Sequence, residues 1–322
     1  LHTLLGPQVR LVSGPGCPVC VSARKDIDRA ILLAEEADTA VCVFGDLFSV
    51  PGSRGSLAQA AARGRDVRVV YSVQDVLDAA RTDPARRFIF ISIGFETTTP
   101  STALAIIQAS REGILNFSVL CLNKTMPAAL RAVVSGSPRV LDALLCPGHV
   151  STITGTALYD FIPREFSVPC CVTGFEPLDI LRAVFLLVQM HQRGTAAVVN
   201  AYERAVRPEG NLRARVCMEE VFEPADVEWR GFGVIPASGL RIREAYAHFD
   251  AAGLIAEPPP EASAEKPGCR CAQVLRGICK PTECALFGRE CRPEAPYGAC
   301  MVSSEGVRSE ERRVGKECTI QC

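Results

Sequence analysis

The chain has 322 residues, 48% of them hydrophobic, and its 35 basic and 36 acidic residues give a formal net charge of −1. This length and apolar content support sizeable cores and exclude an intrinsically disordered protein. The balanced charge argues against nucleic acid or an anionic membrane as a partner, and no apolar run approaches the roughly 18 residues of a membrane helix.

Apolar, β-rich runs alternate with helical patterns along most of the chain. The predicted strands cover residues 40–44, 67–71, 88–93, 117–121, 143–146 and 170–172, and the predicted helices lie near 22–36, 55–64, 73–82, 101–113, 126–136 and 177–193. Continuously apolar strands indicate burial on both faces, so the alternation predicts an α/β, doubly wound architecture with parallel sheets. We expect helical character to continue to about Val206, then turns and short elements, and an exposed Pro-, Ala- and Glu-rich linker from 257 to 267.

Cysteine is the unusual residue, because the chain contains 16. Their density is below that of a small disulfide scaffold, and a core of this size needs no disulfides, so we expect cytoplasmic thiols that bind metal or carry out redox chemistry. Single cysteines in apolar surroundings are predicted to be small core residues: Cys42, Cys121, Cys170, Cys171 and Cys217.

Cys17 and Cys20 form a CxxC pair that lies between a Gly- and Pro-rich turn and a predicted helix. This spacing places two sulfurs within reach of one metal ion or of each other, and a helix start favours a thiolate. The flanking glycines and prolines favour an exposed, reactive pair. Two packed thiols or half of a zinc site are the alternatives.

Polar turns follow several predicted strands, where open α/β sheets form their sites. Glu96, in Gly-Phe-Glu-Thr-Thr-Thr-Pro, is either an acid or base or a helix cap. Asp46, which follows the predicted strand at 40–44, is a weaker candidate for the same roles. His149, in Cys-Pro-Gly-His, is either a ligand or proton carrier or an ordinary turn histidine. The loop at 51–56 could cradle an anion but lacks nucleotide-binding spacing, and a second Gly-Phe-Glu turn at 174–176 hints at two similar α/β halves.

Six cysteines gather within 32 residues near the C-terminus: Cys269, Cys271, Cys279, Cys284, Cys291 and Cys300. Thiolates are the usual ligands of iron–sulfur clusters, and four suffice for a [4Fe–4S] cluster. The spacing matches neither ferredoxin pattern. Zinc is the alternative, although zinc sites usually pair cysteines two to four residues apart and only Cys279 and Cys284 come close.

Together these segments resemble the HypD family of hydrogenase maturation factors. The matching stretches are GPGCPVC (14–20), FGDLFSVPGSRGSL (44–57), GFETTTP (94–100), NFSVLC (116–121), PGHVSTITG (147–155), GFEPLDIL (174–181), VIPASGLRIRE (234–244) and FGRECRPEAPYGACMVSSEG (287–306). The resemblance implies two Rossmann-like α/β domains, which we place at 1–120 and 121–255, and a linker with a small [4Fe–4S] domain at 256–306.

The resemblance also implies a function in assembling the Fe(CN)2CO unit of [NiFe] hydrogenases, with a HypC-type chaperone and a HypE-type cyanide donor as partners. It assigns iron binding and thiol redox chemistry to Cys17 and Cys20. The implied cluster ligands are Cys269, Cys284, Cys291 and Cys300, with Cys271 as the close alternative; Cys279 lies where the family has no expected cysteine. Glu96, His149 and Glu176 match family motifs, and we take Glu96 and His149 as catalytic candidates.

The sequence departs from the family pattern at both ends. The family's Cys-Gly-x-His-Thr-His-type segment is expected before GPGCPVC and is not in the printed sequence, and 307–322 reads like a translated sequencing adapter, so we expect it to be a non-native tail. Two other functions remain open: a stand-alone thiol–disulfide oxidoreductase and a zinc-stabilised scaffold protein.

Overall fold

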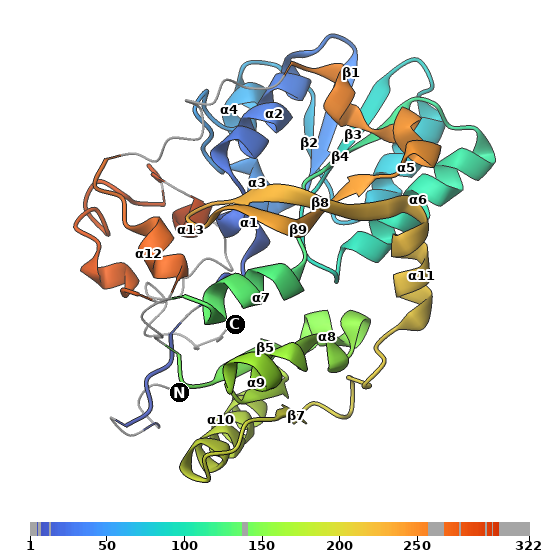
Figure 1. The fold of residues 1–322 in the computed structure, drawn as a ribbon. Coiled ribbons are helices and arrows are strands. Elements are labelled where there is room, and N and C mark those ends of the chain that lie inside the picture. The colour runs from blue at the N-terminus through green and yellow to red at the C-terminus, as the bar shows by residue number, and fades with distance from the viewer. Residues whose placement is uncertain are drawn as a thin grey trace.

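The structure is a computed structural model that describes residues 5, 8–12, 14–136, 141–256, 267–276, 278–293, 295–297 and 299–302, without the side chains of 299 and 300. Two parallel sheets, an antiparallel hairpin and a C-terminal segment of short helices make up this part (Figure 1). Residues 257–266 of the predicted linker and the whole predicted tail at 307–322 lie outside the described residues.

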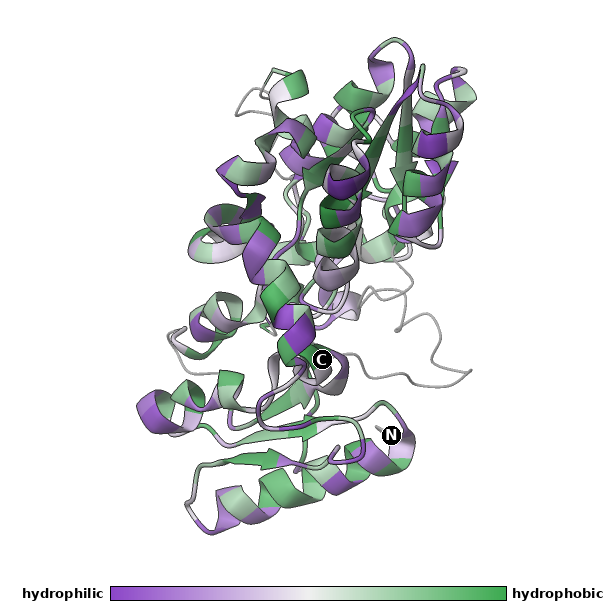
Figure 2. Ribbon diagram, turned by 90° about the vertical axis from the view of Figure 1, so that its right-hand side faces the viewer, coloured by the Kyte–Doolittle hydropathy of each residue, from purple (hydrophilic) through white to green (hydrophobic). Residues whose placement is uncertain are grey.

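The larger sheet contains β1 (Thr39–Val43), β2 (Val67–Val69), β3 (Arg87–Ser92) and β4 (Phe117–Cys121), all parallel in the order β2-β1-β3-β4. Alternate residues of its strands enter two different cores, with Val41 in one and Cys42 in the other. The covering helices are α2 (Arg24–Glu35), α4 (Leu57–Ala62), α5 (Val73–Thr82) and α6 (Thr99–Glu112). Burial on both faces explains the continuously apolar strands, which Figure 2 shows in green between helices with hydrophilic outer sides.

The smaller sheet contains β5 (Leu144–Pro147), β6 (Cys170–Thr173) and β7 (Val198–Asn200), parallel in the order β5-β6-β7. Its helical elements are α8 (Gly148–Thr154), η1 (Ala157–Tyr159), α9 (Phe161–Phe166) and α10 (Pro177–Gln192). Cys171 faces Ala183 and Leu187 of α10, whereas Cys170 faces the main core. As predicted, both thiols are small core residues.

The chain then returns to the larger sheet through α11 (Leu212–Val221) and the antiparallel hairpin of β8 (Phe222–Trp229) and β9 (Gly233–Ile242). Phe222 and Ile242 share a core with Phe117 of β4, and Thr125 N donates to Ser238 O at 2.8 Å. Two short helices, η2 (Glu244–Phe249) and η3 (Ala251–Leu254), follow the hairpin. The predicted domain boundaries stay a prediction, but this packing places 222–254 beside the larger sheet.

The C-terminal segment contains α12 (Cys271–Leu275), η5 (Pro281–Glu283) and α13 (Ala299–Val302). α13 lies against α1 (Pro18–Val21), and α12 lies against the turn of the β8–β9 hairpin. Two further short helices, α3 (Gly45–Phe48) and α7 (Met126–Val134), follow β1 and β4. No helix of the described residues is long and apolar enough to cross a membrane.

The predicted α/β class with parallel sheets is confirmed and is consistent with a Rossmann-like fold. The predicted helical continuation to Val206 is wrong, because α10 ends at Gln192 and Val198–Asn200 pairs with β6 as a third strand. Arg193 caps the helix and Gly194, with φ +62°, turns the chain towards that strand.

The hairpin turn offers a test of how the C-terminal segment is held. Gly231 has φ +84°, and a Cβ there would lie 2.7 Å from Ala272 Cα, whereas Gly233 has φ +74° and open space around its Cβ position. Both alanine variants should lose about 1–2 kcal/mol of unfolding free energy from backbone strain. Gly231→Ala should lose about 1–3 kcal/mol more through the clash and should speed proteolysis of the cysteine-rich segment. Equal losses in urea unfolding would contradict this packing.

Candidate redox and metal centre

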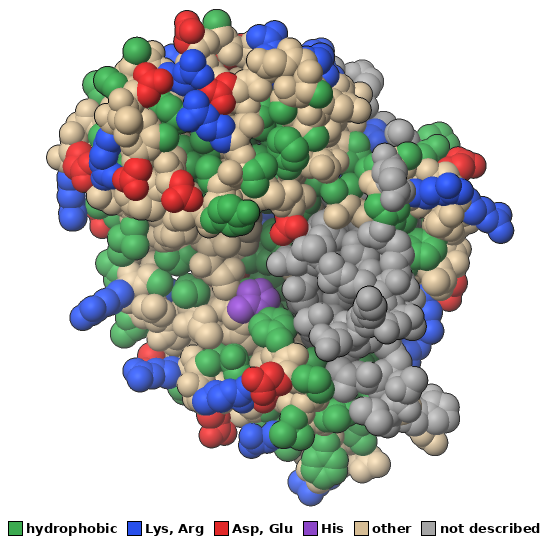
Figure 3. Space-filling view, turned by 180° about the vertical axis from the view of Figure 1, so that it is seen from behind, with side chains coloured by type: hydrophobic (Ala, Val, Ile, Leu, Met, Phe, Trp, Pro, Cys, Tyr) green, Lys and Arg blue, Asp and Glu red, His purple; other side chains and the backbone are tan. Residues whose placement is uncertain are grey.

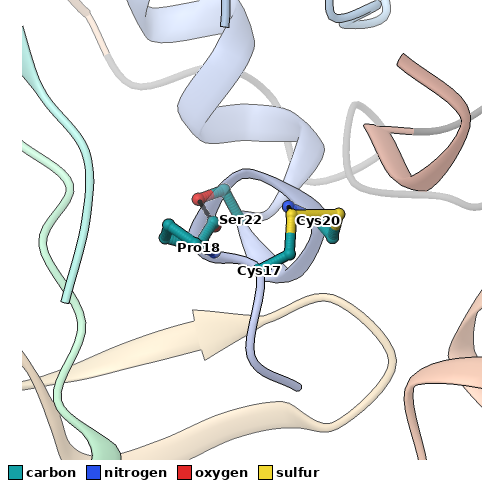
Figure 4. Close-up of a disulfide and its surroundings, with 4 residues drawn as sticks. All are labelled: Cys17, Pro18, Cys20 and Ser22. Carbon is teal, nitrogen blue, oxygen red and sulfur yellow. Dashed lines mark hydrogen bonds between the residues drawn. A yellow bond between two sulfur atoms is a disulfide. The ribbon is translucent and has the colours of Figure 1, made fainter. Parts of the chain in front are cut away.

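Cys17 and Cys20 form a disulfide at the start of α1, with their Cα atoms 5.2 Å apart (Figure 4). Cys17 is the N-cap residue, and its Sγ accepts a hydrogen bond from Cys20 N at 3.1 Å. Ser22 Oγ donates to Pro18 O at 2.9 Å and closes the other side of the turn. The CxxC turn therefore holds its two sulfurs at bonding distance and directs one backbone amide at Cys17.

The expectation that this pair is exposed is wrong, because Cys17 is 5% and Cys20 0% exposed. Both thiols belong to the main core, together with Trp229 of the hairpin, and α13 lies against α1. Arg230 N donates to Val21 O at 2.7 Å, and Ser22 pairs with Trp229 in a short β-bridge. Elements far away in the sequence thus cover a turn whose glycines and prolines suggest exposure.

Trp229 connects the CxxC turn to the Gly-Phe-Glu turn after β3. Its ring stacks on Phe95 with centroids 6.0 Å apart, and its Nε1 donates to Ser238 Oγ at 2.8 Å. Because Phe95 directly precedes Glu96, the structure brings the Glu96 turn into the packing around Trp229.

A buried lysine lies beside Trp229 that sequence reasoning missed. Lys124 Nζ lies 5.8 Å from the Trp229 ring centroid, donates to Glu228 O at 3.1 Å and lies 3.7 Å from Asp26 Oδ2. Burial lowers the pKa of Lys124, and the Asp26 carboxylate opposes this shift. A lysine three residues after the end of β4 was the available signal, since sites form at the carboxyl ends of parallel strands.

Glu96 is buried, with 4% of its surface exposed. Its Oε1 accepts from Met126 N, the first amide of α7, at 2.9 Å, while its Oε2 is buried without a hydrogen-bond partner among the described residues. Burial raises the pKa of Glu96 to about 7. The sequence left open whether Glu96 is an acid or base or a helix cap. In the structure its side chain caps a helix, but this helix is α7 and not α6, which follows Glu96 in the sequence.

His149 lies in the first turn of α8, after β5. Its Nδ1 is buried without a hydrogen-bond partner in the described part of the chain, and its ring lies 5.0 Å from that of Phe175. Burial lowers the pKa of His149, which keeps the imidazole neutral at pH 7. On the face opposite to Figure 1, one histidine side chain lies in a hollow between the upper and lower parts of the molecule (Figure 3).

The pKa of Tyr159 depends on charged groups that follow or belong to both sheets. Its hydroxyl shares a 2.9 Å hydrogen bond with Ser151 Oγ, which also donates to Pro147 O at 2.8 Å. Burial raises the pKa of Tyr159 well above its usual value, and Cys146, Glu96 and Cys170 add to that shift, whereas Ser151 opposes it. The charge of Glu96, in the turn after β3, therefore contributes to the raised pKa of Tyr159 in η1, which belongs to the smaller sheet's layer of helices.

The other sequence candidates lie outside this arrangement. Glu176 is exposed and pairs with Arg204 at 3.7 Å. The proposed anion cradle already holds the chain's own carboxylate, because Asp28 accepts from Ser53 N at 2.7 Å, Ser53 Oγ at 2.6 Å and Arg54 N at 3.3 Å. Asp46 lies in the first turn of α3.

Most of the C-terminal cysteines are buried: Cys271, Cys284 and Cys291 are 1%, 3% and 0% exposed, and Cys269 is half-buried. Cys291 Sγ accepts from Tyr297 N at 3.4 Å. Cys279 packs with Val274 in a separate small cluster. The side chain of Cys300 lies outside the described residues.

The thiol set suits an iron–sulfur cluster in its chemistry, because such clusters take four thiolates and accept backbone N–H groups at their sulfurs. Among the described side chains, no three His, Cys, Asp or Glu groups are gathered as a metal site. Three of the expected ligands, Cys269, Cys284 and Cys291, are among these described side chains, whereas the side chain of Cys300 is not.

The fold and the thiols define an α/β protein with parallel sheets and a CxxC disulfide packed beside a cysteine-rich C-terminal segment. The sequence matches the HypD family, described as "Hydrogenase formation hypA family", over residues 1–310. It is 46% identical over 311 residues to the hydrogenase maturation factor HypD of Rhodobacter capsulatus, covering 95% of this chain and 82% of that protein. It is 44% identical over 308 residues to the protein of the same name from Escherichia coli K12, with the same coverage. The chain therefore belongs to the HypD family of hydrogenase maturation factors.

Proposed function

We propose that this protein is a cytoplasmic scaffold and thiol redox partner in assembling the Fe(CN)2CO unit of [NiFe] hydrogenases. A HypC-type chaperone and a HypE-type cyanide donor are its proposed partners. The relatives' names support a role in hydrogenase maturation. The observation that carries the redox part is the Cys17–Cys20 disulfide packed next to the cysteine-rich segment.

We propose that Cys269, Cys284, Cys291 and Cys300 hold a [4Fe–4S] cluster, with Cys271 as the alternative to one of them. Burial of Cys284 and Cys291 and the Tyr297 N–H directed at Cys291 Sγ support this ligand set. When bound, such a cluster supplies or accepts single electrons.

In the proposed reaction the CxxC pair alternates between disulfide and dithiol. A protein-bound thiocyanate, R–S–C≡N, and the dithiol give R–SH, CN⁻, one proton and the Cys17–Cys20 disulfide, so atoms and charge balance. Cys20 N donates to Cys17 Sγ, which stabilises a thiolate at Cys17 and favours it as the attacking sulfur. The iron that receives the cyanide is cargo, held between thiolates of this protein and its chaperone, because soft thiolates suit such iron.

Replacing Cys17 by serine should abolish cyanide transfer to iron in the complete assembly of this protein with its chaperone and cyanide donor. The reason is that serine cannot form the disulfide that takes up the reaction's two oxidising equivalents. Transferred cyanide is followed by infrared spectroscopy of the bound iron. Cys217→Ser on α11, away from the CxxC turn, is the control and should transfer normally. Normal transfer by Cys17→Ser would refute the redox role of the pair.

Metal analysis with an anaerobic absorption spectrum separates this function from its competitors. A brown protein with about four irons per chain supports the maturation scaffold with its cluster. Bound zinc supports a zinc-stabilised scaffold. A colourless, metal-free chain with a redox-active disulfide supports a stand-alone thiol–disulfide oxidoreductase, which the observed disulfide also favours.

A further inference from the structure

Helix α10 carries apolar side chains on the side that faces away from its sheet. Leu178 is 77% and Phe185 59% exposed, although the opposite side of the helix already packs Ala183 and Leu187 against Cys171 of β6. A helix that is apolar on all sides is usually covered on all sides. Within the described structure, the outward side of α10 has no such cover.

The outward apolar residues of α10 form one stripe, because their positions advance by three and four residues. Leu181 and Val188 are half-buried and lie beside Leu178 and Phe185 along the helix. We call these four residues the α10 stripe. Their spacing is that of a coiled-coil seam, and it extends about 15 Å. Figure 1 places α10 at the lower end of the molecule, and Figure 3 shows hydrophobic side chains beside Lys or Arg side chains at that end.

The helix α5 shows the pattern expected of a helix that covers a sheet and meets solvent. Its buried side includes Val76 and Leu77, and its exposed residues Gln74, Asp78 and Arg81 are all polar. The α10 stripe therefore departs from the ordinary surface of this fold. It is also a contiguous feature, unlike single exposed apolar residues, which need no explanation.

Two arginines give one flank of the α10 stripe a positive charge. Arg182 and Arg193 are exposed and lie about three helical turns apart, so they project on the same side of α10. In the part of the chain that the structure describes, neither forms an ion pair. The carboxylate of Asp179 is held instead by Arg204, whose Nη1 and Nη2 donate to it at 2.8 and 2.6 Å. Cations that are available beside an apolar stripe favour an acidic ligand.

We propose that the α10 stripe is a docking site for an amphipathic helix of a partner protein, one whose apolar residues are flanked by Asp or Glu. The acidic residues face Arg182 and Arg193. A helix reaches the half-buried Leu181 and Val188 by packing along the side of the stripe, whereas a flat membrane surface reaches only the outermost side chains. This inference goes beyond the proposed function, because it depends on neither the thiols nor iron.

A second copy of this chain fits the α10 stripe less well than an acidic partner. In an antiparallel self-pairing centred between Leu181 and Phe185, the two Arg182 side chains would lie on the same flank at nearly the same height and repel each other. A homodimer held by this stripe would also use four side chains per copy, against the roughly 20–30 residues of a stable interface. Recognition of a single helix needs only a few anchors at this spacing.

The first test measures charge preference with two synthetic helical peptides of about 21 residues. Both have leucine at the positions that pack on the stripe, and the flanking positions are glutamate in one and lysine in the other. Fluorescence anisotropy should show that the full wild-type chain binds the acidic peptide about 10-fold more tightly. Arg182→Glu should weaken acidic-peptide binding by about 3- to 10-fold and strengthen basic-peptide binding. Arg213→Glu, exposed on α11, is the matched control and should bind as wild type does.

The second test removes apolar contacts from the α10 stripe. Phe185→Ser and Leu178→Ser should each weaken acidic-peptide binding by about 10-fold, because each loses a large apolar side chain from the contact. Both positions are exposed, so if one variant fails to fold, the other still makes the test. Val216→Ser removes an apolar side chain that is 61% exposed on α11, and it should bind the peptide as wild type does.

Four results would overturn the proposal. The first is no binding of the acidic peptide at millimolar concentration, and the second is equal affinity for the two peptides. The third is a wild-type dimer in sedimentation that Phe185→Ser converts to a monomer, which would assign the stripe to a second copy of this chain. The fourth is binding of wild type, but not of Phe185→Ser, to phosphatidylglycerol vesicles, which would assign it to a membrane surface.

Discussion

Replacing Lys124 by alanine is expected to lower the free energy of unfolding by about 3–5 kcal/mol, the usual consequence of removing one partner from a buried ion pair. The side chain of Lys124 is 2% exposed and that of its partner Asp26 11%. The substitution leaves the mostly buried Asp26 carboxylate without its cation. It also removes the donor to Glu228 O and the cation beside the Trp229 ring.

Lys25 provides a matched control because it also interacts with Glu228. Lys25 Nζ lies 3.1 Å from Glu228 Oε2, and the two side chains are 35% and 24% exposed. Lys25→Ala should therefore change stability by no more than about 1 kcal/mol. Urea unfolding measures the free energy of unfolding of both variants. Similar losses in Lys124→Ala and Lys25→Ala would show that the buried Lys124–Asp26 pair contributes no more to stability than the half-buried Lys25–Glu228 pair.

A double variant separates the unpaired charge from the lost packing. Lys124→Met with Asp26→Asn removes both charges, and a neutral pair of similar volume often costs little. It should be more stable than Lys124→Ala, with a coupling energy of about 1–3 kcal/mol between the two sites. Additive losses would mean that Lys124 acts through its packing alone.

The parallel sheets could be predicted because burial on both faces leaves a direct record in the sequence. Phe88 and Ile89 of β3 enter different cores, so the strand is apolar without interruption from Phe88 to Ile91. The antiparallel hairpin of β8 and β9 leaves no comparable pattern of apolar residues in the sequence. Its register shifts between Ala225 and Val227, and β8 alternates buried, half-buried and exposed residues, so no regular period of two appears.

The site was predicted only where its residues are neighbours in the sequence. The CxxC spacing alone indicated that the sulfurs of Cys17 and Cys20 lie within reach of one metal ion or of each other, and in the structure they form a disulfide. Their burial depends on the hairpin and α13, which come from the far end of the chain. The Lys124–Asp26 pair was missed for the same reason, because the two residues lie 98 positions apart in the sequence and only the folded chain brings the segment after β4 to α2.

Glu96→Gln is expected to stabilise the protein at pH 8 by on the order of 3 kcal/mol, because about 1.4 kcal/mol corresponds to one pKa unit. The pKa of Glu96 is raised from 4.5 in the unfolded chain to about 7 in the folded protein, so folding favours its protonated form. That favourable contribution is fully present below pH 4.5 and is lost as the pH rises through about 7. Above that pH wild type carries a buried carboxylate, whereas glutamine stays neutral and still accepts from Met126 N.

Urea unfolding of wild type and Glu96→Gln between pH 4.5 and 8 measures this difference, which should be near zero at the acidic end and grow towards neutrality. Glu176→Gln, exposed in the equivalent turn, should show no such trend. A constant difference across the range would mean that Glu96 has an ordinary pKa and acts only as the cap of α7. A difference that grows with pH would show that burial raises the pKa of Glu96 and that its carboxylate destabilises the folded protein above that pKa.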